Sequence, residues 1–297
     1  MIQVRELVKS FDGFRALDGL NITVPKGAVY GLVGPNGAGK STVIRHLAGI
    51  YRADSGEVLV GGEPVYENPA VKARIAYIPD DIFYYGGATI RDMKNFYRSM
   101  IPSFSDERFE KLSAAFELKS AQSMRRLSKG MQKQAAFWLA LSCCPEVILL
   151  DEPVDGLDPV MRRQIWSLLL QDVAERETTV LVSSHNLREL EDVCDHVGIM
   201  NRGKMLLERP LAEMQDNTVK IQLALPEGRA LPEGLEILHC TETGRLRQLI
   251  LRGKPEELTA RLAACEPFFM DVLPLSLEEI FIYELGGAEH EIKNILL

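Results

Sequence analysis

The stretch Gly34–Ser41, GPNGAGKS, combines residue types suited to binding phosphate. It fits the pattern G-x-x-x-x-G-K-[ST], in which backbone N–H groups surround the phosphates and the following helix presents its positive N-terminal end. We expect Lys40 to meet the β- and γ-phosphates and Ser41 to offer its hydroxyl to Mg²⁺, with Thr42 bonding on the α-phosphate side. The stretch comprises Gly34, Pro35, Asn36, Gly37, Ala38, Gly39, Lys40 and Ser41. The alternative is a plain glycine-rich turn, but the match lies between an expected strand and an expected helix, where a phosphate loop is required. The motif therefore predicts binding of a nucleoside triphosphate.

A second stretch, Val147–Glu152, reads as an apolar strand that ends in two carboxylates. At the carboxyl end of a strand these acids would lie beside the phosphate loop. Asp151 can hold Mg²⁺ through water, and Glu152 can orient or deprotonate a water that attacks the γ-phosphate. Alone, such a strand could be structural, but together with the phosphate loop it predicts a nucleoside triphosphatase.

The elements that must position these residues predict an α/β fold. Val29–Val33, Val147–Leu150 and Thr179–Val182 are apolar throughout, which is typical of a parallel sheet buried on both faces. Residues 1–33 read as short strands separated by turns, and helical periodicity dominates from about residue 90 to 141. After residue 214, short strands and helices indicate a small α+β domain. We therefore expect one large domain over 1–215, with a helical subdomain over about 82–142, and an accessory domain over 216–297.

Composition limits the class of protein. The 46% hydrophobic and 26% charged content is ordinary for a globular chain, and the formal net charge of -8 provides no basic surface for nucleic acid. The longest apolar run, 135–150, is interrupted by Pro145 and Glu146 and falls short of the roughly 20 residues that span a bilayer. The first residues lack the apolar segment of a secretory signal, so we expect a cytoplasmic protein whose membrane connection is made through a partner.

The sequence Leu127–Gln132, LSKGMQ, resembles the LSGGQ signature of the ABC ATPases. Four other elements accompany it in the family's order: the phosphate loop, ILLDEP at 148–153, VDGLD at 154–158, and His185 after a strand. The resemblance covers residues 1 to about 215. It implies a P-loop NTPase core of the ABC ATPase type with an inserted helical subdomain.

This resemblance also implies further site residues. In the family the nucleotide lies between two subunits, so Ser128 and Gly130 would contact the γ-phosphate held by Lys40 of the other chain. His185 matches the switch histidine that senses that phosphate, and Asp158 matches the loop that couples the two sites. Phe11 matches the aromatic residue on which adenine stacks, although it could equally be a core residue.

Departures from the family pattern leave some roles open. The family usually has Gln after the strand near 75–79, whereas this chain has Asp80 followed by Asp81. Asp80 could ligate Mg²⁺ through water or merely cap the next segment. Lys129 and Met131 replace Gly and Gln of the signature, but the Ser and the second Gly are intact.

The segment Ile82–Gly87, IFYYGG, falls where family members form the groove that grips a short helix of the membrane partner. Aromatic residues are favoured at such interfaces. The alternative is that these side chains pack inside the helical subdomain.

Three stretches narrow the resemblance: IAYIPDD, LSKGMQKQ and the C-terminal PLSLEEIF at 274–281 are similar to the ATPases of bacterial ABC-2-type exporters. This implies an ATPase that uses ATP and Mg²⁺ and powers a separate integral membrane permease at the inner face of the cell membrane, as a homodimer or with a second ABC ATPase.

An alternative is an ABC ATPase of DNA repair or translation, which would usually add coiled coils, a hinge or a second nucleotide domain. Another is a regulatory protein that binds ATP without turnover, which would be expected to lose Glu152 or His185.

Overall fold

The computed structural model describes residues 1–154, 156–215, 218–226, 229–276 and 278–279. It divides into two compact units, Met1–His185 with Val193–Glu208, and Asn186–Asp192 with Arg209–Leu297. We describe each unit by itself. The domain boundary after residue 215 and the limits of the helical subdomain stay predictions.

The first unit is built on a six-stranded sheet with the order β10-β9-β3-β8-β7-β6. Strands β6, β7, β8, β3 and β9 pair in parallel. Every residue of β3, β7 and β8 is buried, which confirms the α/β class expected from their apolar sequences. The strands are β3 Val29–Val33, β6 Ile75–Ile78, β7 Val147–Asp151, β8 Thr179–Ser184, β9 His196–Asn201 and β10 Lys204–Pro210.

A smaller antiparallel sheet, with the order β2-β1-β4-β5, holds the N-terminus. Its strands are β1 Ile2–Phe11, β2 Phe14–Val24, β4 Ser55–Val60 and β5 Glu63–Pro64. The expectation of short strands here was wrong, because β1 and β2 form one long hairpin whose irregular register obscures the alternation. Its turn is Asp12-Gly13, with φ of 47° and 82°, as a two-residue type I′ turn requires.

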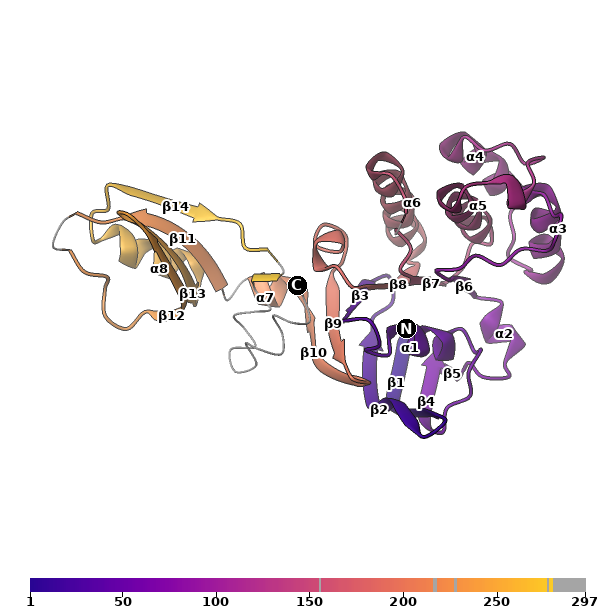
Figure 1. Ribbon diagram of the computed structural model, residues 1–297, viewed down its shortest axis with the longest axis horizontal. Helices are drawn as coiled ribbons and strands as arrows, with labels where there is room; N and C mark the ends of the chain where they lie inside the picture. The colour runs from indigo at the N-terminus through magenta and orange to yellow at the C-terminus, as the bar shows by residue number, and fades with distance from the viewer. Residues whose placement is uncertain (155, 216–217, 227–228, 277, 280–297) are drawn as a thin grey trace. The chain divides into compact units, whose positions relative to one another are not determined.

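One hydrophobic core joins the two sheets of this unit. Helix α1, Lys40–Leu47, lies between them and buries Val43, Ile44 and Leu47 completely. These side chains belong to the same cluster as Leu20 of β2 and Leu149 of β7. Figure 1 shows α5 and α6 on the other side of the parallel sheet. The helix that follows the phosphate loop is thus fixed from both sides. A short helix, α2 Pro69–Lys72, precedes β6.

The remaining helices of this unit are α3 Ile90–Met100, α4 Asp106–Phe116, α5 Lys129–Ser142 and α6 Pro159–Arg176, with a short 3₁₀ turn at Met124–Arg126. Each of the four α-helices begins at a side-chain cap, namely Thr89, Ser105, Ser128 and Asp158. Trp138 of α5 stacks on Phe109 of α4 with ring centroids 4.3 Å apart. Its indole N–H also donates to the Phe109 carbonyl at 2.7 Å, so both the ring and its polar atom are satisfied.

A buried ion pair links α4 to α6. The Arg108 guanidinium donates to the Asp172 carboxylate, and Arg108 Nε donates to the Leu141 carbonyl of α5 at 2.8 Å. Asp172 is completely buried, and its Oδ2 has no hydrogen-bond partner. Burial raises the pKa of this carboxyl, and Arg108 opposes that rise. The charge at Asp172 therefore depends chiefly on Arg108, with a smaller contribution from Arg176.

The second unit contains a four-stranded antiparallel sheet with the order β12-β13-β11-β14. Helix α8 packs Leu258 and Leu262 against Ile221 and Leu249 of the sheet. The elements are a 3₁₀ turn at Leu187–Glu189, α7 Leu211–Gln215, β11 Thr218–Ala224, β12 Glu236–Thr243, β13 Leu246–Arg252, α8 Pro255–Ala263 and β14 Phe269–Leu273. The predicted small α+β fold is confirmed for this part. A helix expected near 277–285 and the end of the PLSLEEIF pattern lie outside the described residues.

Within the described part of the chain, no helix is both long enough and apolar enough to cross a membrane.

Replacing Arg108 with Met keeps the apolar stem but leaves the Asp172 carboxylate buried without its cation. We expect this change to lower the free energy of unfolding by about 3–5 kcal/mol, measured by urea denaturation. Without Arg108 the pKa of Asp172 in the folded state lies further above its unfolded value. The loss should therefore grow as pH rises from about 4.5 to 8, since the neutral acid needs no cation as a partner.

The control is Lys111→Met on the same helix. It breaks an ion pair with Glu107 in which the two side chains are 74% and 77% exposed, so its free energy of unfolding should stay close to that of the parent. Equal losses at low and high pH would contradict this account of Asp172.

Candidate nucleotide-binding site

A cavity of about 740 Å³ lies where the phosphate loop and the turns after β6 and β7 meet. Its walls combine an aromatic end, a glycine-rich loop and three aspartates with one glutamate. The predicted site residues among its lining are Phe11, Asn36, Gly37, Ala38, Gly39, Lys40, Ser41, Thr42, Asp80, Asp151 and Glu152. The structure therefore brings together residues from across the first 152 positions, and the volume suits a ligand of nucleotide size.

The backbone of the phosphate loop requires glycine at two places. A Cβ on Gly34 would lie 2.3 Å from the carbonyl oxygen of Met200, so the loop can pass this close to β9 only without a side chain. Gly39, the residue before α1, has φ of +106°, and a Cβ there would lie 2.9 Å from the Ala16 carbonyl oxygen. These two close approaches aim the N-terminal end of α1 into the cavity, where it can bind an anion.

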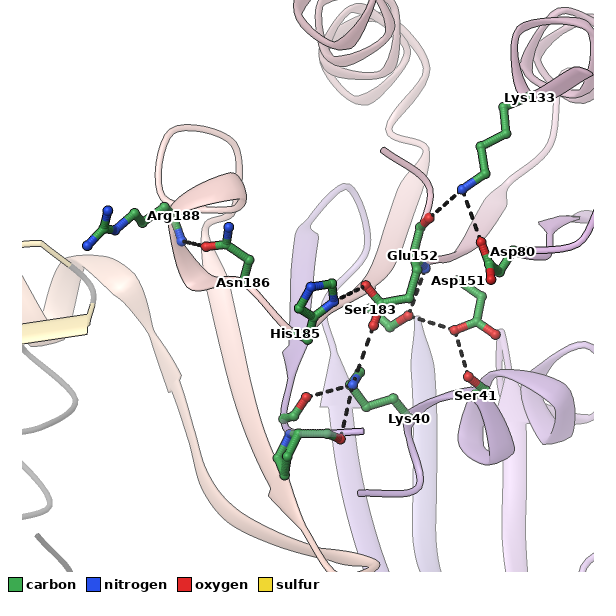
Figure 2. Close-up of polar contacts among 12 residues, drawn as sticks. Lys40, Ser41, Asp80, Lys133, Asp151, Glu152, Ser183, His185, Asn186 and Arg188 are labelled. Carbon is green, nitrogen blue, oxygen red and sulfur yellow. Dashed lines mark hydrogen bonds and ion pairs between the residues drawn. The ribbon is translucent and has the colours of Figure 1, made fainter. Parts of the chain in front are cut away.

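Lys40 is 5% exposed, and its ammonium is held by three oxygens (Figure 2). Nζ donates to the carbonyls of Gly34 at 2.6 Å and Pro35 at 3.3 Å, and it lies 3.4 Å from Glu152 Oε1. A buried ammonium needs such partners because desolvation of an unpaired charge is costly. Gly34 and Pro35 do not line the cavity, and their carbonyls position Lys40 instead.

Ser41 and Asp151 form an oxygen pair suited to Mg²⁺. The Ser41 hydroxyl donates to Asp151 Oδ1 at 2.9 Å, and the Ser183 hydroxyl donates to the same oxygen at 2.8 Å. The described residues contain no group of three His, Cys, Asp or Glu that could hold a metal ion alone. Mg²⁺ in phosphate-transfer sites is usually held by one or two protein oxygens together with the phosphates and water, so this donor set fits the ion.

Glu152 lies between Lys40 and His185 (Figure 2). Its Oε1 approaches Lys40, and its Oε2 lies 3.0 Å from Nδ1 of His185, the nitrogen that can donate to it. The Glu152 backbone has φ of 46°, in the left-handed region, and its N–H donates to Ser183 Oγ at 3.1 Å. The carboxylate is thus held at a fixed place, where it can orient an attacking water.

Asp80 enters the site from the turn after β6. It lines the cavity, and its Oδ1 lies 3.1 Å from Nζ of Lys133 on α5. Sequence reasoning missed the role of Lys133: it stands in the stretch LSKGMQKQ, but after the signature residues it reads as an ordinary helical residue.

The aromatic end of the cavity contains residues that were not expected from the sequence. Phe11 meets Tyr51 edge to face with centroids 5.3 Å apart, and the Arg45 guanidinium lies 5.9 Å from the Tyr51 ring. Phe14 and Ile50 line the same end, and both are more than half exposed. The sequence offered one signal, the pair Ile50-Tyr51 shortly after α1, where exposed apolar side chains would have no core to enter.

Tyr77 of β6 lies deeper in the cavity. Burial, and then the charge of Asp151, raises the pKa of its phenol. The hydroxyl therefore stays protonated and can act as a donor near Asp151.

Besides Gly34 and Pro35, four predicted residues do not line the cavity. His185 contacts Glu152 instead, and the other three lie elsewhere. Ser128, Gly130 and Asp158 do not line the cavity. Ser128 caps α5 by accepting from the Met131 N–H at 3.3 Å, and Asp158 caps α6 by accepting from Val160 and Met161 at 3.0 Å. Gly130 packs so closely on the Gly156 carbonyl that a Cβ would lie 3.0 Å from it. Within one chain, Ser128 and Asp158 therefore cap helices, and Gly130 allows close packing at the start of α5.

Comparison with known proteins agrees with this geometry. Residues 17–155 match the family described as ABC transporter. The ABC transporter ATP-binding protein YtrB of Bacillus subtilis is 33% identical over 97% of this chain and 99% of its own length. The chain belongs to the ABC transporter ATP-binding proteins. It is an ATPase and a nucleotide-binding subunit, as the motifs predicted, and nothing found supports the DNA-repair or translation alternative.

Two further likenesses bear on this ABC ATPase. The bacitracin transport ATP-binding protein BcrA of Bacillus licheniformis is 33% identical over 74% of this chain and 73% of its own length. The solved ATP-binding subunit of an ABC transporter superposes with a TM-score of 0.67 at 25% identity, over 72% of this chain and 92% of that one. The predicted fold, an ABC-type P-loop NTPase core, is confirmed.

Phe11→Ala and Tyr51→Ala should each weaken ATP binding by about 5- to 100-fold, because each removes an aromatic surface on which a base can stack. Calorimetric titration with ATP and with inorganic triphosphate checks this, since the loss should fall on ATP and leave triphosphate binding nearly unchanged. Tyr66→Ala removes an aromatic ring that is 40% exposed and lies outside this cavity, and it should bind both ligands like the parent. Equal losses for ATP and triphosphate would rule out a contact with the base.

Proposed function

We propose that this chain binds MgATP in the cavity of the first unit, hydrolyses it as part of a dimer, and thereby powers export through a separate membrane permease. The observation that supports this most strongly is the convergence of Lys40, Asp151 and Glu152 on one cavity, with His185 bonded to Glu152 and contacts of 2.9–3.4 Å among these residues and Ser41.

Each side chain has a distinct task in this proposal. The backbone of residues 36–42 and the α1 N-terminus bind the phosphates, with Thr42 on the α-phosphate side, and Lys40 turns from the Gly34 carbonyl to the β- and γ-phosphates. Mg²⁺, held by Ser41 and Asp151 with Asp80 as a candidate ligand through water, would neutralise charge on the phosphate oxygens. Glu152 orients and deprotonates the attacking water, and His185 supports Glu152 and contacts the γ-phosphate.

A second subunit completes the site. Ser128 and Gly130 lie at the start of α5 but outside the cavity, which supports a site in which the signature segment that meets the γ-phosphate comes from another chain. Asp158, at the start of α6, would pair the two sites across that interface. The second subunit can be another copy of this chain or a different ABC ATPase.

The permease would dock on a groove of about 340 Å³ between β6, α3 and α5. Phe83, Tyr85, Phe96 and Tyr97 meet edge to face in a row beside it, with centroids 5.1–6.0 Å apart. Phe83 is 71% exposed and Tyr85 47% exposed, which favours an interface over packing inside the helical subdomain. Tyr84 points elsewhere, its hydroxyl lying 3.4 Å from the Gln132 side chain. Docking there would place this chain at the inner face of the cell membrane.

Export, rather than import, is supported by the sequence resemblance to ABC-2-type exporters. Among the relatives, the daunorubicin/doxorubicin resistance ATP-binding protein of Streptomyces peucetius is named for drug resistance. The permease would choose the cargo.

Glu152→Gln should leave ATP binding intact and lower hydrolysis by about 10²- to 10⁴-fold, since the amide cannot accept the proton of the attacking water. With ATP the variant should accumulate as a dimer on size exclusion with light scattering. Glu146→Gln changes the acid just before the same strand, 51% exposed and paired with Arg74, and should hydrolyse ATP like the parent. Turnover of the Glu152 variant at the parent rate would exclude Glu152 as the base.

Phe83→Ser combined with Tyr85→Ser should abolish recovery of a polytopic membrane protein when the tagged chain is purified from detergent-solubilised membranes of its native host. ATP hydrolysis and the melting temperature should stay near the parent values, because both rings are already exposed to solvent. Phe268→Ser, which changes an aromatic residue that is 76% exposed and lines neither the groove nor the nucleotide cavity, controls for general loss of apolar surface. A loss of melting temperature with membrane recovery intact would instead favour internal packing.

A further inference from the structure

Lys133 is a buried lysine outside every nucleotide-binding motif. It lies on α5, directly after the signature segment Leu127–Gln132, and is 5% exposed. A buried ammonium is retained only where strong acceptors surround it. Its partners therefore indicate what the charge does.

The two acceptors of Lys133 come from the turns after two different strands (Figure 2). Nζ donates to the Glu152 carbonyl oxygen at 2.9 Å and to Asp80 Oδ1 at 3.1 Å. Asp80 follows β6, and Glu152 follows β7. One ammonium thus ties together the two loops that bring acids to the cavity.

The hydrogen bond from Lys133 to Glu152 stabilises an unfavourable backbone conformation. A residue with a Cβ seldom adopts the left-handed φ of 46° found there, unless its neighbours hold it. Ser183 Oγ accepts from the N–H of Glu152, and Lys133 donates to its C=O. Both polar groups of this peptide segment are fixed by side chains, so the direction of the carboxylate follows from them.

The ion pair between Lys133 and Asp80 compensates the negative charge of the Asp80 carboxylate. Asp80, Asp151 and Glu152 all line the cavity that would hold the phosphates. Lys133 is the cation bonded to the Asp80 carboxylate, whose side chain is 60% exposed and otherwise able to turn. A released Asp80 would present an uncompensated negative charge to a polyanionic ligand, which weakens binding.

We infer that Lys133 is a positioning residue for ATP hydrolysis, which holds the Glu152 backbone for turnover and restrains the Asp80 charge for nucleotide binding. The inference rests on the proposed function, in which Glu152 is the base and the cavity binds ATP. It predicts two separable effects from one side chain.

The test uses the full-length chain and four variants: Lys133→Gln, Lys133→Arg, the double variant Asp80→Asn with Lys133→Gln, and Lys94→Gln as control. Lys94 belongs to α3. Its side chain is 15% exposed and forms an ion pair with Asp106 at 2.9 Å. Lys94→Gln therefore removes a largely buried lysine from an ion pair, as Lys133→Gln does, but away from the cavity. The measurements are the ATP Kd by calorimetry in EDTA and in Mg²⁺, kcat, and the melting temperature.

Lys133→Gln should lower kcat by about 10- to 100-fold and weaken ATP binding by about tenfold, in EDTA as well as in Mg²⁺. Lys133→Arg should recover most of both losses, because it restores the charge and the donors. Adding Asp80→Asn should return the Kd to near the parent value and leave kcat low, since the Glu152 contact remains absent. Lys94→Gln should reduce only the melting temperature.

Equal melting losses for Lys133→Gln and Lys94→Gln, with kcat and Kd unchanged, would overturn the inference and leave Lys133 a structural residue. Weakened binding seen only in Mg²⁺ would refute the charge argument and assign Asp80 to the metal. Should Lys133→Gln not fold, Lys133→Met, which fills the buried space without a charge, is measured in its place. Failure of the proposed function is separate, because then the parent chain itself would not bind ATP.

Discussion

The parallel direction of β3, β6, β7 and β8 is the constraint on which the site depends. Since these strands run the same way, their carboxyl ends meet at one edge of the sheet, and the chain leaves that edge at each phosphate-binding or acidic segment. The register is tight: Val33 pairs with Ser184, and Asp151 pairs with Ser183. The phosphate loop, the adjacent acids Asp151 and Glu152, and His185 therefore become neighbours, although these three segments are far apart in sequence.

Two buried lysines determine the electrostatics of this edge of the parallel sheet. Lys40 and Lys133 are both 5% exposed, and each contacts Glu152, one through the carboxylate and the other through the backbone carbonyl. Hydrogen-bond donors and acceptors thus alternate from His185 to Glu152 to Lys40, and again from the Glu152 carbonyl to Lys133 to Asp80. Dipoles and charges held this way need little rearrangement when charge develops on a phosphate, which is the main source of catalytic stabilisation in such sites.

The sequence was sufficient for those parts of the fold and site whose chemistry depends on local order. Fully apolar strands identified the parallel sheet, and the spacing of Gly, Lys and Ser identified the loop that binds phosphate, because backbone geometry there tolerates few other residues.

Lys133 and Tyr51 were missed for the opposite reason. Their partners, Glu152 and Phe11, stand far away in the chain, and a lysine in a helix or a tyrosine after one has no local pattern that sets it apart. The long β1–β2 hairpin was missed because its bulges break the alternation. Roles that need a second chain, those of Ser128, Gly130 and Asp158, stay predictions.

The contact between Arg108 and Asp172 has a mechanical consequence. Arg108 binds α6 through Asp172 and α5 through the Leu141 carbonyl, so α4, α5 and α6 are locked together as a stiff block. This block is joined to the sheet by four backbone connections, which are the turns that leave β6 and β7 and the segments that lead from α5 into β7 and from α6 into β8. Asp80 and Glu152 stand in the first two of these connections, so a rotation of the helices against the sheet would shift residues that line the cavity for the phosphates.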